Sequence, residues 1–314
     1  MKILKKQSGK DFIVLNITDP QLSAEEWATE TQHRKILEYT ITQLIEKVKP
    51  DLITISGDVA WAGQDAAYDA FANFLNAFQI PWAPVWGNHD NQGGAEFIDG
   101  VATRYMTYSH CLYEKGDKAL GNGNYVISIE ENGTPVTAFV MMDSHDRLPY
   151  TDEKGETQMA WAKLPPEQGV WYAKQAKALQ AQGCKDVTAL LHIPIYAYRE
   201  AATAVFKTVG TPAEGETYVE GVGYQYEGIS SYPEEDGMLD VFKQTQITKR
   251  VLVGHDHVNN WMIQWQGIQL IYGLKAGAGC YWTSQLNGGT VLKINDGGVY
   301  EVAHQFVDVS QFLE

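Results

Sequence analysis

The chain has 314 residues, of which 44% are hydrophobic and 20% are charged, and these proportions are ordinary for a globular protein. Its formal net charge of −15 argues against a surface for polymeric nucleic acid, because binding to a phosphate backbone depends on clustered Lys and Arg. Three cysteines, Cys111, Cys184 and Cys280, are too few and too scattered for a disulfide framework or a thiolate metal site, so we expect reduced thiols.

The N-terminal half of the chain alternates short β-branched runs with helical patterns, which is typical of a layered α/β fold. The apolar run that follows the basic N-terminus is too short for a signal peptide, and no apolar stretch is long enough to span a bilayer, so we expect a cytoplasmic protein without membrane contact. We expect strands at 12–17, 52–56 and 82–86, separated by helices at 24–49 and 66–78. Such β-α-β units predict parallel strands joined by right-handed crossovers.

The second half of the chain has a different pattern. We expect four strands at 125–129, 136–142, 187–191 and 250–253, and then four more at 261–265, 268–272, 290–294 and 299–305. Short turns join most of the last four, which predicts an antiparallel meander that forms or extends a second sheet. Residues 146–168 and 199–238 lack periodicity and are interpreted as excursions over a functional face. Without an interdomain linker, residues 1–314 are expected to form a single domain.

Five segments place Asp, Asn, His or Gln directly after a predicted strand. They are Asp19-Pro20-Gln21, Gly57-Asp58, Gly87-Asn88-His89-Asp90, Leu191-His192 and Gly254-His255-Asp256-His257. Ligands bind at the carboxyl ends of strands in open α/β sheets, so these segments should converge in space. Oxygen donors mixed with imidazoles suit Mn, Fe, Zn or similar divalent ions. Several carboxylates in one pocket also repel each other unless cations neutralise them.

The order of these motifs resembles the calcineurin-like metallophosphoesterase superfamily, over the chain from about Asp19 to His257. The resemblance implies a two-sheet α/β/β/α sandwich that holds two divalent metal ions. The runs 272–279 and 143–145 resemble the branch related to purple acid phosphatases. Trp61 stands where that branch has a tyrosine, so we expect no purple ferric centre.

The resemblance also implies a role for each residue. Asp58 corresponds to the carboxylate that bridges the two ions. The remaining metal ligands are Asp19, Gln21 and His257 for one ion and Asn88, His192 and His255 for the other. His89 corresponds to the histidine that protonates the leaving oxygen or steadies the phosphate oxygens, and Asp90 to the carboxylate that orients His89. Gln21 stands where the family commonly has histidine, and its neutral amide is a weaker donor.

The implied activity is hydrolysis of phosphomonoesters or small nucleotide-type phosphoesters by attack of a metal-bridging hydroxide. The acidic composition favours a small phosphorylated substrate over polymeric nucleic acid. A phosphodiesterase acting on cyclic nucleotides or nucleotide-diphosphate esters would share every ligand, and a non-catalytic regulatory protein could retain the fold. The sequence leaves the metals, the physiological substrate and the oligomeric state open.

Other residues near these segments have less specific patterns. His145 either lines the pocket or makes a structural hydrogen bond, and Asp256 is expected to point away from both neighbouring histidines, either behind the ligands or at the surface. Aromatic side chains in or near the pocket loops are candidates for holding an organic leaving group: Trp61, Tyr196, Tyr198, Tyr224 and Tyr226. No role is assigned to His33, His110 or His304.

Overall fold

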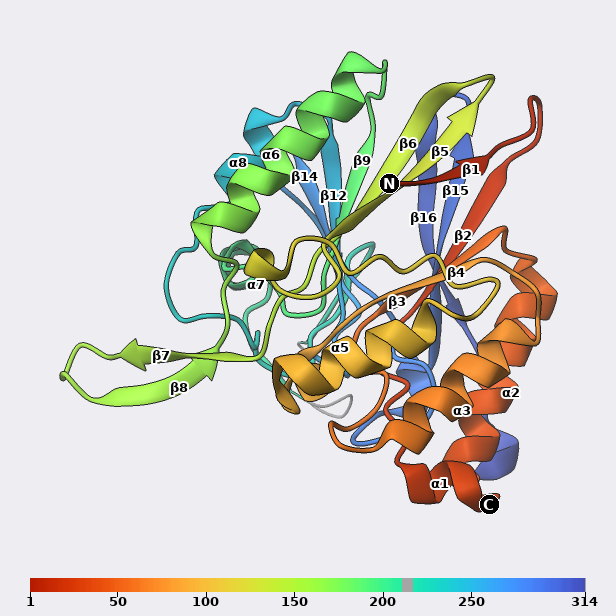
Figure 1. The fold of residues 1–314 in the computed structure, drawn as a ribbon. Coiled ribbons are helices and arrows are strands. Elements are labelled where there is room, and N and C mark those ends of the chain that lie inside the picture. The colour runs from red at the N-terminus through yellow and green to blue at the C-terminus, as the bar shows by residue number, and fades with distance from the viewer. Residues whose placement is uncertain (211–216, 314) are drawn as a thin grey trace.

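The computed structural model describes residues 1–210 and 217–313 and has two β-sheets packed against each other between layers of helices (Figure 1). The seven-stranded sheet runs in the order β1 (Lys2–Lys5), β5 (Tyr125–Glu131), β6 (Thr134–Met141), β9 (Val187–Leu190), β12 (Thr248–Val253), β14 (Ile268–Tyr272) and β13 (Met262–Trp265). The five-stranded sheet runs in the order β16 (Gly298–Phe306), β15 (Gly288–Asn295), β2 (Phe12–Ile17), β3 (Leu52–Ser56) and β4 (Trp82–Val85). This architecture is the expected α/β/β/α sandwich.

Helices cover the outer side of each sheet (Figure 1). Beside the five-stranded sheet lie α1 (Ala24–Ala28), α2 (Gln32–Val48), α3 (Asp65–Asn76) and α5 (Gly94–Tyr105), and beside the seven-stranded sheet lie α6 (Pro166–Ala181), α7 (Ala197–Val205) and α8 (Met238–Gln244). Short 3₁₀ helices lie at Lys118–Leu120, Ser284–Leu286 and Ser310–Phe312. Strand β12 shows how the layers form, because successive side chains of a strand point to opposite faces. Leu252 packs in the core that includes the five-stranded sheet, whereas Val251 and Val253 pack in the core that includes α6 and α8.

The helix expected at 24–49 is two helices. Ser23 caps α1 and forms a reciprocal capping box with Glu26, and Thr31 caps α2 by accepting a hydrogen bond from the Arg34 backbone N–H. The intervening Thr29 has an extended backbone. Hydroxyl side chains bind free N–H groups at helix starts, so a second capping residue within the apolar pattern begins a second helix.

The last four strands divide between the two sheets, so the expectation of a single meander is wrong. β13 and β14 extend the seven-stranded sheet, where β14 pairs in parallel with β12, and β15 and β16 extend the five-stranded sheet, where β15 pairs with β2. Short turns determine which strands are neighbours, but the choice of sheet depends on the buried face that each hairpin covers.

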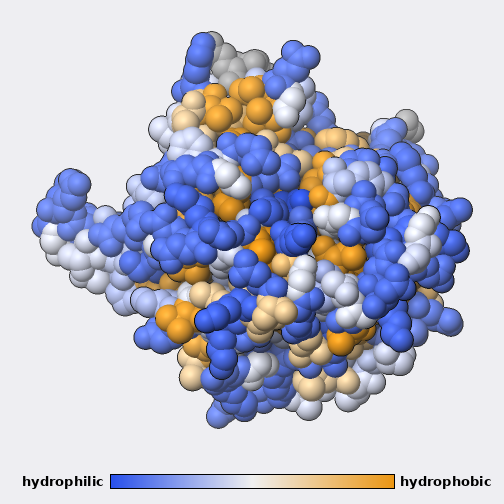
Figure 2. Space-filling model, turned by 90° about the horizontal axis from the view of Figure 1, so that it is seen from above, coloured by the Kyte–Doolittle hydropathy of each residue, from blue (hydrophilic) through white to orange (hydrophobic). Residues whose placement is uncertain are grey.

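The two unperiodic segments both contain regular structure. In the first, β7 (Arg147–Thr151) and β8 (Thr157–Trp161) form a hairpin that protrudes from the body, at the left of Figures 1 and 2, with a hydrophilic tip. The second contains most of α7 and the short strands β10 (Tyr218–Val219) and β11 (Gly223–Tyr224); its residues 211–216 lie outside the described part of the chain. Strand β1 and helix α6 were not expected from the sequence. Within the described ranges, no helix has both the length and the apolar character needed to cross a membrane.

Candidate metal centre

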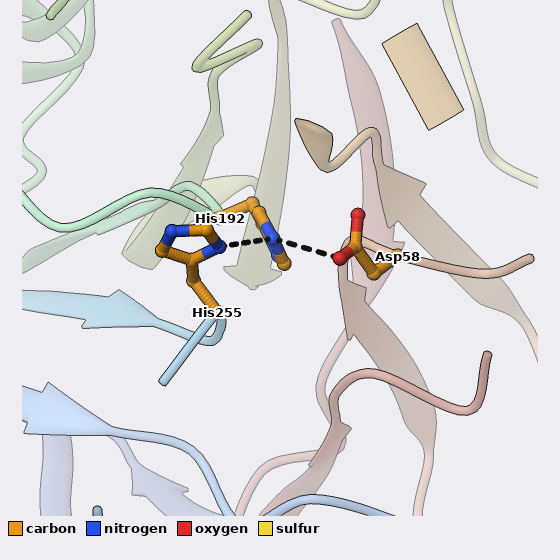
Figure 3. Close-up of side chains that lie close together, drawn as sticks. All are labelled: Asp58, His192 and His255. Atoms are coloured by element: carbon orange, nitrogen blue, oxygen red, sulfur yellow. Dashed lines mark hydrogen bonds and ion pairs between the residues drawn. The ribbon is translucent and has the colours of Figure 1, made fainter. Parts of the chain in front are cut away.

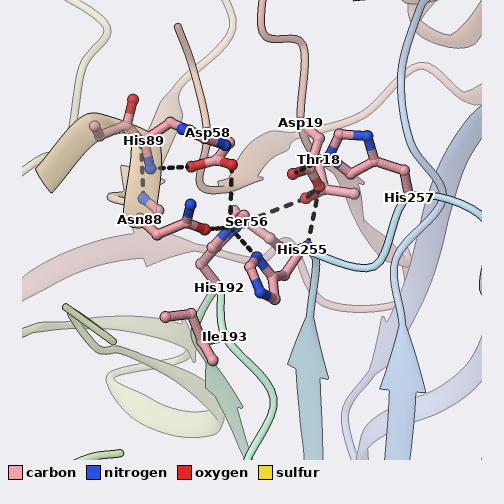
Figure 4. A network of polar contacts seen from close by, with 12 residues as sticks. Thr18, Asp19, Ser56, Asp58, Asn88, His89, His192, Ile193, His255 and His257 are labelled. Atoms are coloured by element: carbon pink, nitrogen blue, oxygen red, sulfur yellow. Dashed lines mark hydrogen bonds and ion pairs between the residues drawn. The ribbon is translucent and has the colours of Figure 1, made fainter. Parts of the chain in front are cut away.

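The loops after five parallel strands meet in one buried network of polar side chains (Figure 4). Asp19, Asp58 and Asn88 follow β2, β3 and β4 of one sheet, while His192 and His255 follow β9 and β12 of the other. All five side chains are buried. The strands are parallel within each sheet, so their carboxyl ends lie at the same edge and the segments converge as expected.

The backbone at these strand ends is strained. Four candidate ligands have left-handed dihedral angles, with φ of 52° at Asp19, 43° at Gln21, 48° at Asp58 and 76° at His255. Such conformations cost on the order of 1–3 kcal/mol each for a residue with a side chain and concentrate at functional sites. Gly57 also has a positive φ of 87°, and a Cβ there would lie 2.6 Å from the His192 ring. Close packing of the loops therefore requires glycine at this position.

Three potential ligands surround one nitrogen of His192, and Figure 3 shows two of them, Asp58 and His255. Its Nδ1 lies 2.7 Å from the Ser56 carbonyl oxygen, which can only accept, so Nδ1 carries a proton. In the neutral ring, Nε2 then carries a free electron pair. Three atoms face that nitrogen: Asn88 Oδ1 at 3.0 Å, His255 Nδ1 at 3.2 Å and Asp58 Oδ2 at 3.4 Å. Electron pairs that face one another in a buried site repel each other, and a bound cation would remove this repulsion.

A second group of possible metal ligands surrounds Asp19 in a similar arrangement. His257 Nδ1 lies 2.8 Å from the Tyr281 carbonyl oxygen, so in the neutral ring its Nε2 presents a free electron pair to Asp19 Oδ1 at 3.2 Å. The Gln21 backbone N–H donates to the Asp58 carbonyl, and the Gln21 side chain is fully buried. Among the described residues, neither polar atom of its amide has a hydrogen-bond partner. A buried amide without partners is costly, and a metal ion would satisfy its oxygen.

Asp58 connects the two groups. Asp58, His192 and His255 place their nitrogen and oxygen atoms within 4.8 Å of one another, and so do Asp19, Asp58 and His257. A carboxylate common to both groups fits the bridging position of a dinuclear centre. The donors are carboxylate oxygens, amide oxygens and imidazole nitrogens, which suit divalent ions of the Mn, Fe or Zn type.

The charges in the centre are strongly coupled. Burial acts to raise the pKa of Asp19, but His257 and His192 outweigh it and the pKa is lowered. Burial acts to lower the pKa of His192, but Asp58 and Asp19 raise it to about 10. Burial, together with the nearby His192, lowers the pKa of His255 to about 3. The surroundings thus raise the pKa of one facing histidine and lower that of the other, which favours one positive charge between them at a position that a cation can occupy.

His89 lies at the edge of this centre. Its backbone N–H donates to Asp58 Oδ1 at 2.9 Å, and its half-buried ring packs 4.3 Å from the Trp61 ring, centre to centre. His89 Nδ1 lies 2.9 Å from Gln92 Oε1, so Gln92 holds the ring. Trp61 therefore lies at the site, as expected.

The expectation that Asp90 orients His89 differs from the structure. Asp90 is the third residue of the short helix α4 (Asn88–Asn91), and its buried carboxylate turns back to the backbone N–H of Gly87 at 2.8 Å. It also accepts from the Val59 backbone at 3.1 Å and from the Tyr68 hydroxyl at 2.8 Å. Burial and the nearby Asp58 raise the pKa of Asp90 to about 7. Because neighbouring helical residues point in different directions, Asp90 braces the two ligand loops instead of the His89 ring.

Three other expectations are now decided. Tyr198 is buried in the core with its hydroxyl on the carbonyl of Val251, so its expected place in the pocket is wrong. Asp256 is buried and points away from the centre, where it accepts from the Tyr272 hydroxyl, so a surface position is excluded. His145 makes a 2.8 Å contact with Gln168 and also lines a cavity of about 430 Å³. The structural hydrogen bond is therefore confirmed, whereas that cavity is lined by none of the candidate metal ligands and does not support a place for His145 in the metal pocket.

Three residues that the sequence did not single out contact candidate ligands. The Trp161 ring lies edge-on to His255 at 4.5 Å, and the Tyr281 ring stacks on His257 at 4.1 Å, centre to centre. Lys275 is buried and donates to the Asp19 carbonyl oxygen. Lys275 falls within the run 272–279 that resembles purple acid phosphatases, which was the one available signal. Trp161 lies within the unperiodic segment 146–168 and had none.

A two-sheet sandwich with carboxylate, amide and imidazole donors at its strand ends is the architecture of the metallophosphoesterases. The model of the calcineurin-like phosphoesterase family matches residues 13–259, and the chain belongs to this family.

Curated relatives agree with the narrower resemblance. The chain is 27% identical over 291 residues to Phosphatase DCR2 of Saccharomyces cerevisiae, covering 83% of this chain and 45% of the relative. It is 27% identical over 262 residues to a protein of Arabidopsis thaliana named "probable inactive purple acid phosphatase 28", covering 74% and 60%. The chain thus matches less than two thirds of either relative. A dimetal phosphatase structure from Danio rerio has the same fold, with a TM-score of 0.59, 14% identity, and coverage of 93% of this chain and 98% of that one.

Proposed function

We propose that this chain is a metal-dependent phosphoesterase that hydrolyses phosphomonoesters or small nucleotide-type phosphoesters. The observation that carries the proposal is the position of Asp58, which belongs to both candidate metal groups and also accepts the His89 backbone N–H. The candidate ligands are the seven expected from the sequence: Asp19, Gln21, Asp58, Asn88, His192, His255 and His257.

Each side chain has a defined task in this proposal. Two divalent ions, when bound, would neutralise the phosphoryl oxygens and acidify bound water at neutral pH. His89 donates a proton to the leaving oxygen, while Gln92 and Trp61 hold its ring. Asp90 keeps the loops that carry Asp58 and His89 at a fixed separation through its backbone hydrogen bonds.

The names of some relatives include the word inactive, and this makes a non-catalytic protein the main competing hypothesis. A site that had lost its function would be expected to lack at least one ligand or the proton donor. Here every candidate ligand and His89 are present. The dimetal phosphatase named above shares the fold, which supports the same class of centre in this chain.

The test is hydrolysis of p-nitrophenyl phosphate with added Mn, together with metal analysis of the purified protein. Asp58→Asn and His255→Ala should lose at least about a thousandfold in turnover, because each removes a ligand of a centre that supplies most of the transition-state stabilisation. Matched controls are Asp240→Asn and His33→Ala, which change the same residue types at exposed positions.

Metal-dependent turnover that survives unchanged in both ligand variants would contradict the proposal. A wild-type protein that binds no divalent ion and shows no activation by Mn would favour the non-catalytic hypothesis. Parallel assays with bis-p-nitrophenyl phosphate separate a monoesterase from the phosphodiesterase alternative, which needs the same ligands.

A further inference from the structure

The hairpin β7–β8 begins and ends beside the candidate metal centre. Arg147 opens β7 and pairs in register with Trp161, which ends β8. The guanidinium carbon of Arg147 lies 4.1 Å from the centre of the indole ring of Trp161, and that ring contacts His255. A cation, an aromatic ring and a candidate metal ligand are therefore in contact in that order.

The residue before Arg147 reaches the opposite side of the centre. Asp146 lies beside Gln92, the residue that holds His89, and its carbonyl accepts the Ala162 backbone N–H at 3.0 Å, which closes the base of the hairpin. Residues 146 and 147 thus lie between the His89 side and the His255 side. A substrate bound at the metal ions would meet the base of this hairpin.

The hairpin base is also held in place by Tyr232, which lies in the other excursion. The Tyr232 hydroxyl donates to the Pro149 carbonyl oxygen at 3.4 Å, and its ring packs against Tyr150. Lys163, just after β8, lies 4.2 Å from the centre of the Tyr232 ring. These contacts hold β7, which begins with Arg147, and place a second cation just after β8.

The charge of Arg147 acts on the neighbouring Asp146 carboxyl but is not paired with a carboxylate in the part of the chain that the structure describes. Within the described ranges, neither Arg147 nor Lys163 forms an ion pair, although the chain carries 39 acidic residues against 24 basic ones. Contact with an aromatic face orients a guanidinium but leaves its N–H groups free. Those N–H groups match phosphate or carboxylate oxygens in pairs.

We propose that Arg147 is a specificity-determining residue that binds a second anionic group of the substrate. The indole of Trp161 separates its guanidinium from His255, so Arg147 lies outside the position of the reacting phosphate. The inference rests on the proposed function and narrows its substrate class to phosphoesters that carry another phosphate or a carboxylate.

The test compares two ligands that resist hydrolysis and differ by one anionic group, propylphosphonate and propane-1,3-diphosphonate. Calorimetry with the Mn-loaded protein should give about tenfold or greater preference for the diphosphonate, and Arg147→Gln should remove it, because hydrogen bonds to a charged group are lost. Arg147→Lys should retain part of the preference. Lys154→Gln is the matched control, since it removes one positive charge at the tip of the same hairpin.

The outcomes separate the two proposals. Equal preference in wild type and Arg147→Gln, with both ligands still bound, overturns the inference and leaves the metal-dependent activity standing. If Arg147→Gln weakens the binding of both ligands by the same factor, Arg147 binds the reacting phosphate, and the inference is also overturned. If the Mn-loaded wild type binds neither ligand and does not hydrolyse p-nitrophenyl phosphate, the proposed function fails first.

Discussion

The backbone N–H of His89 donates a 2.9 Å hydrogen bond to Asp58 Oδ1, while Oδ2 of the same carboxylate lies 3.4 Å from His192 Nε2. One side chain therefore contacts the residue proposed as proton donor and a candidate ligand from the opposite sheet. This relationship ties the position of His89 to the metal centre, so that loss of the centre is also expected to displace the proton donor.

Replacing Gln21 with leucine should raise the stability of the metal-free protein but lower the amount of metal that it binds. Gln21→Leu removes a buried amide that has no hydrogen-bond partner among the described residues, so the metal-free protein should gain about 1–3 kcal/mol in free energy of unfolding. If Gln21 is a ligand, the same variant should bind less metal. Urea unfolding in EDTA and metal analysis after dialysis measure the two effects.

Gln21→Glu is the comparison for that variant, because it restores an oxygen donor with a charge. It should retain the metal and lose stability when the metal is removed, since an uncompensated carboxylate is then buried. Unchanged metal content in Gln21→Leu would exclude Gln21 from the centre.

Gln92 is expected to act through His89. Gln92→Ala frees the imidazole ring, so kcat should fall about tenfold, which is part of the effect usual for a general acid, while KM and metal content stay near wild type. His89→Ala should lower kcat by more than Gln92→Ala does. In a double-mutant cycle, removing Gln92 from the His89→Ala variant should have little further effect. Additive losses in the cycle would show that Gln92 acts independently of His89.

Metal binding should stabilise the fold. The candidate ligands come from loops of both sheets, so ions bound between them bind the native state in preference to the unfolded chain. Mn at a hundred times its dissociation constant should raise the free energy of unfolding by about 2.7 kcal/mol for each site. Asp58→Asn should remove most of this gain, whereas Asp240→Asn should keep it. Identical urea midpoints with Mn and with EDTA would contradict the dinuclear centre.

His304 should make stability depend on pH away from the metal centre. Burial lowers its pKa to about 4, and its ring bridges the Thr290 hydroxyl at 3.0 Å and the Asn260 carbonyl oxygen at 2.7 Å. The unfolded chain, with a histidine pKa of about 6.5, binds the proton more readily between pH 4 and 6.5, so stability falls as pH falls through this range. The expected loss at pH 4.5 relative to pH 7 is about 2–3 kcal/mol.

The measurement for His304 is urea unfolding of the metal-free protein at pH 7 and pH 4.5. His304→Asn should be less stable at pH 7 because the ring's contacts with Thr290 and Asn260 are lost, but its stability should decline less on acidification. An equal decline in both proteins would show that His304 does not contribute to the pH dependence.

Much of the centre was predictable because strand ends are local features. Apolar runs such as 12–17 and 52–56 predict buried strands, and parallel strands bring the residues that follow them to one edge. The motifs with Asp58 and His255 were therefore recognisable before their contacts were known. The prediction that Asp90 orients His89 was wrong. The partners of Asp90, the Val59 backbone N–H and the Tyr68 hydroxyl, depend on how two loops pack.

By itself, the sequence determined the strand-end motifs, the two-sheet class of fold and the family, because these depend on local patterns and their order along the chain. Tertiary structure decided which sheet each of the last strands joins, that Asp90 contacts Val59 and Tyr68, and that Arg147 and Trp161 reach the centre. Those relationships join segments that are far apart in the chain, through buried faces and side-chain contacts. The hydrophobic periodicity of one segment does not indicate which distant segment it contacts.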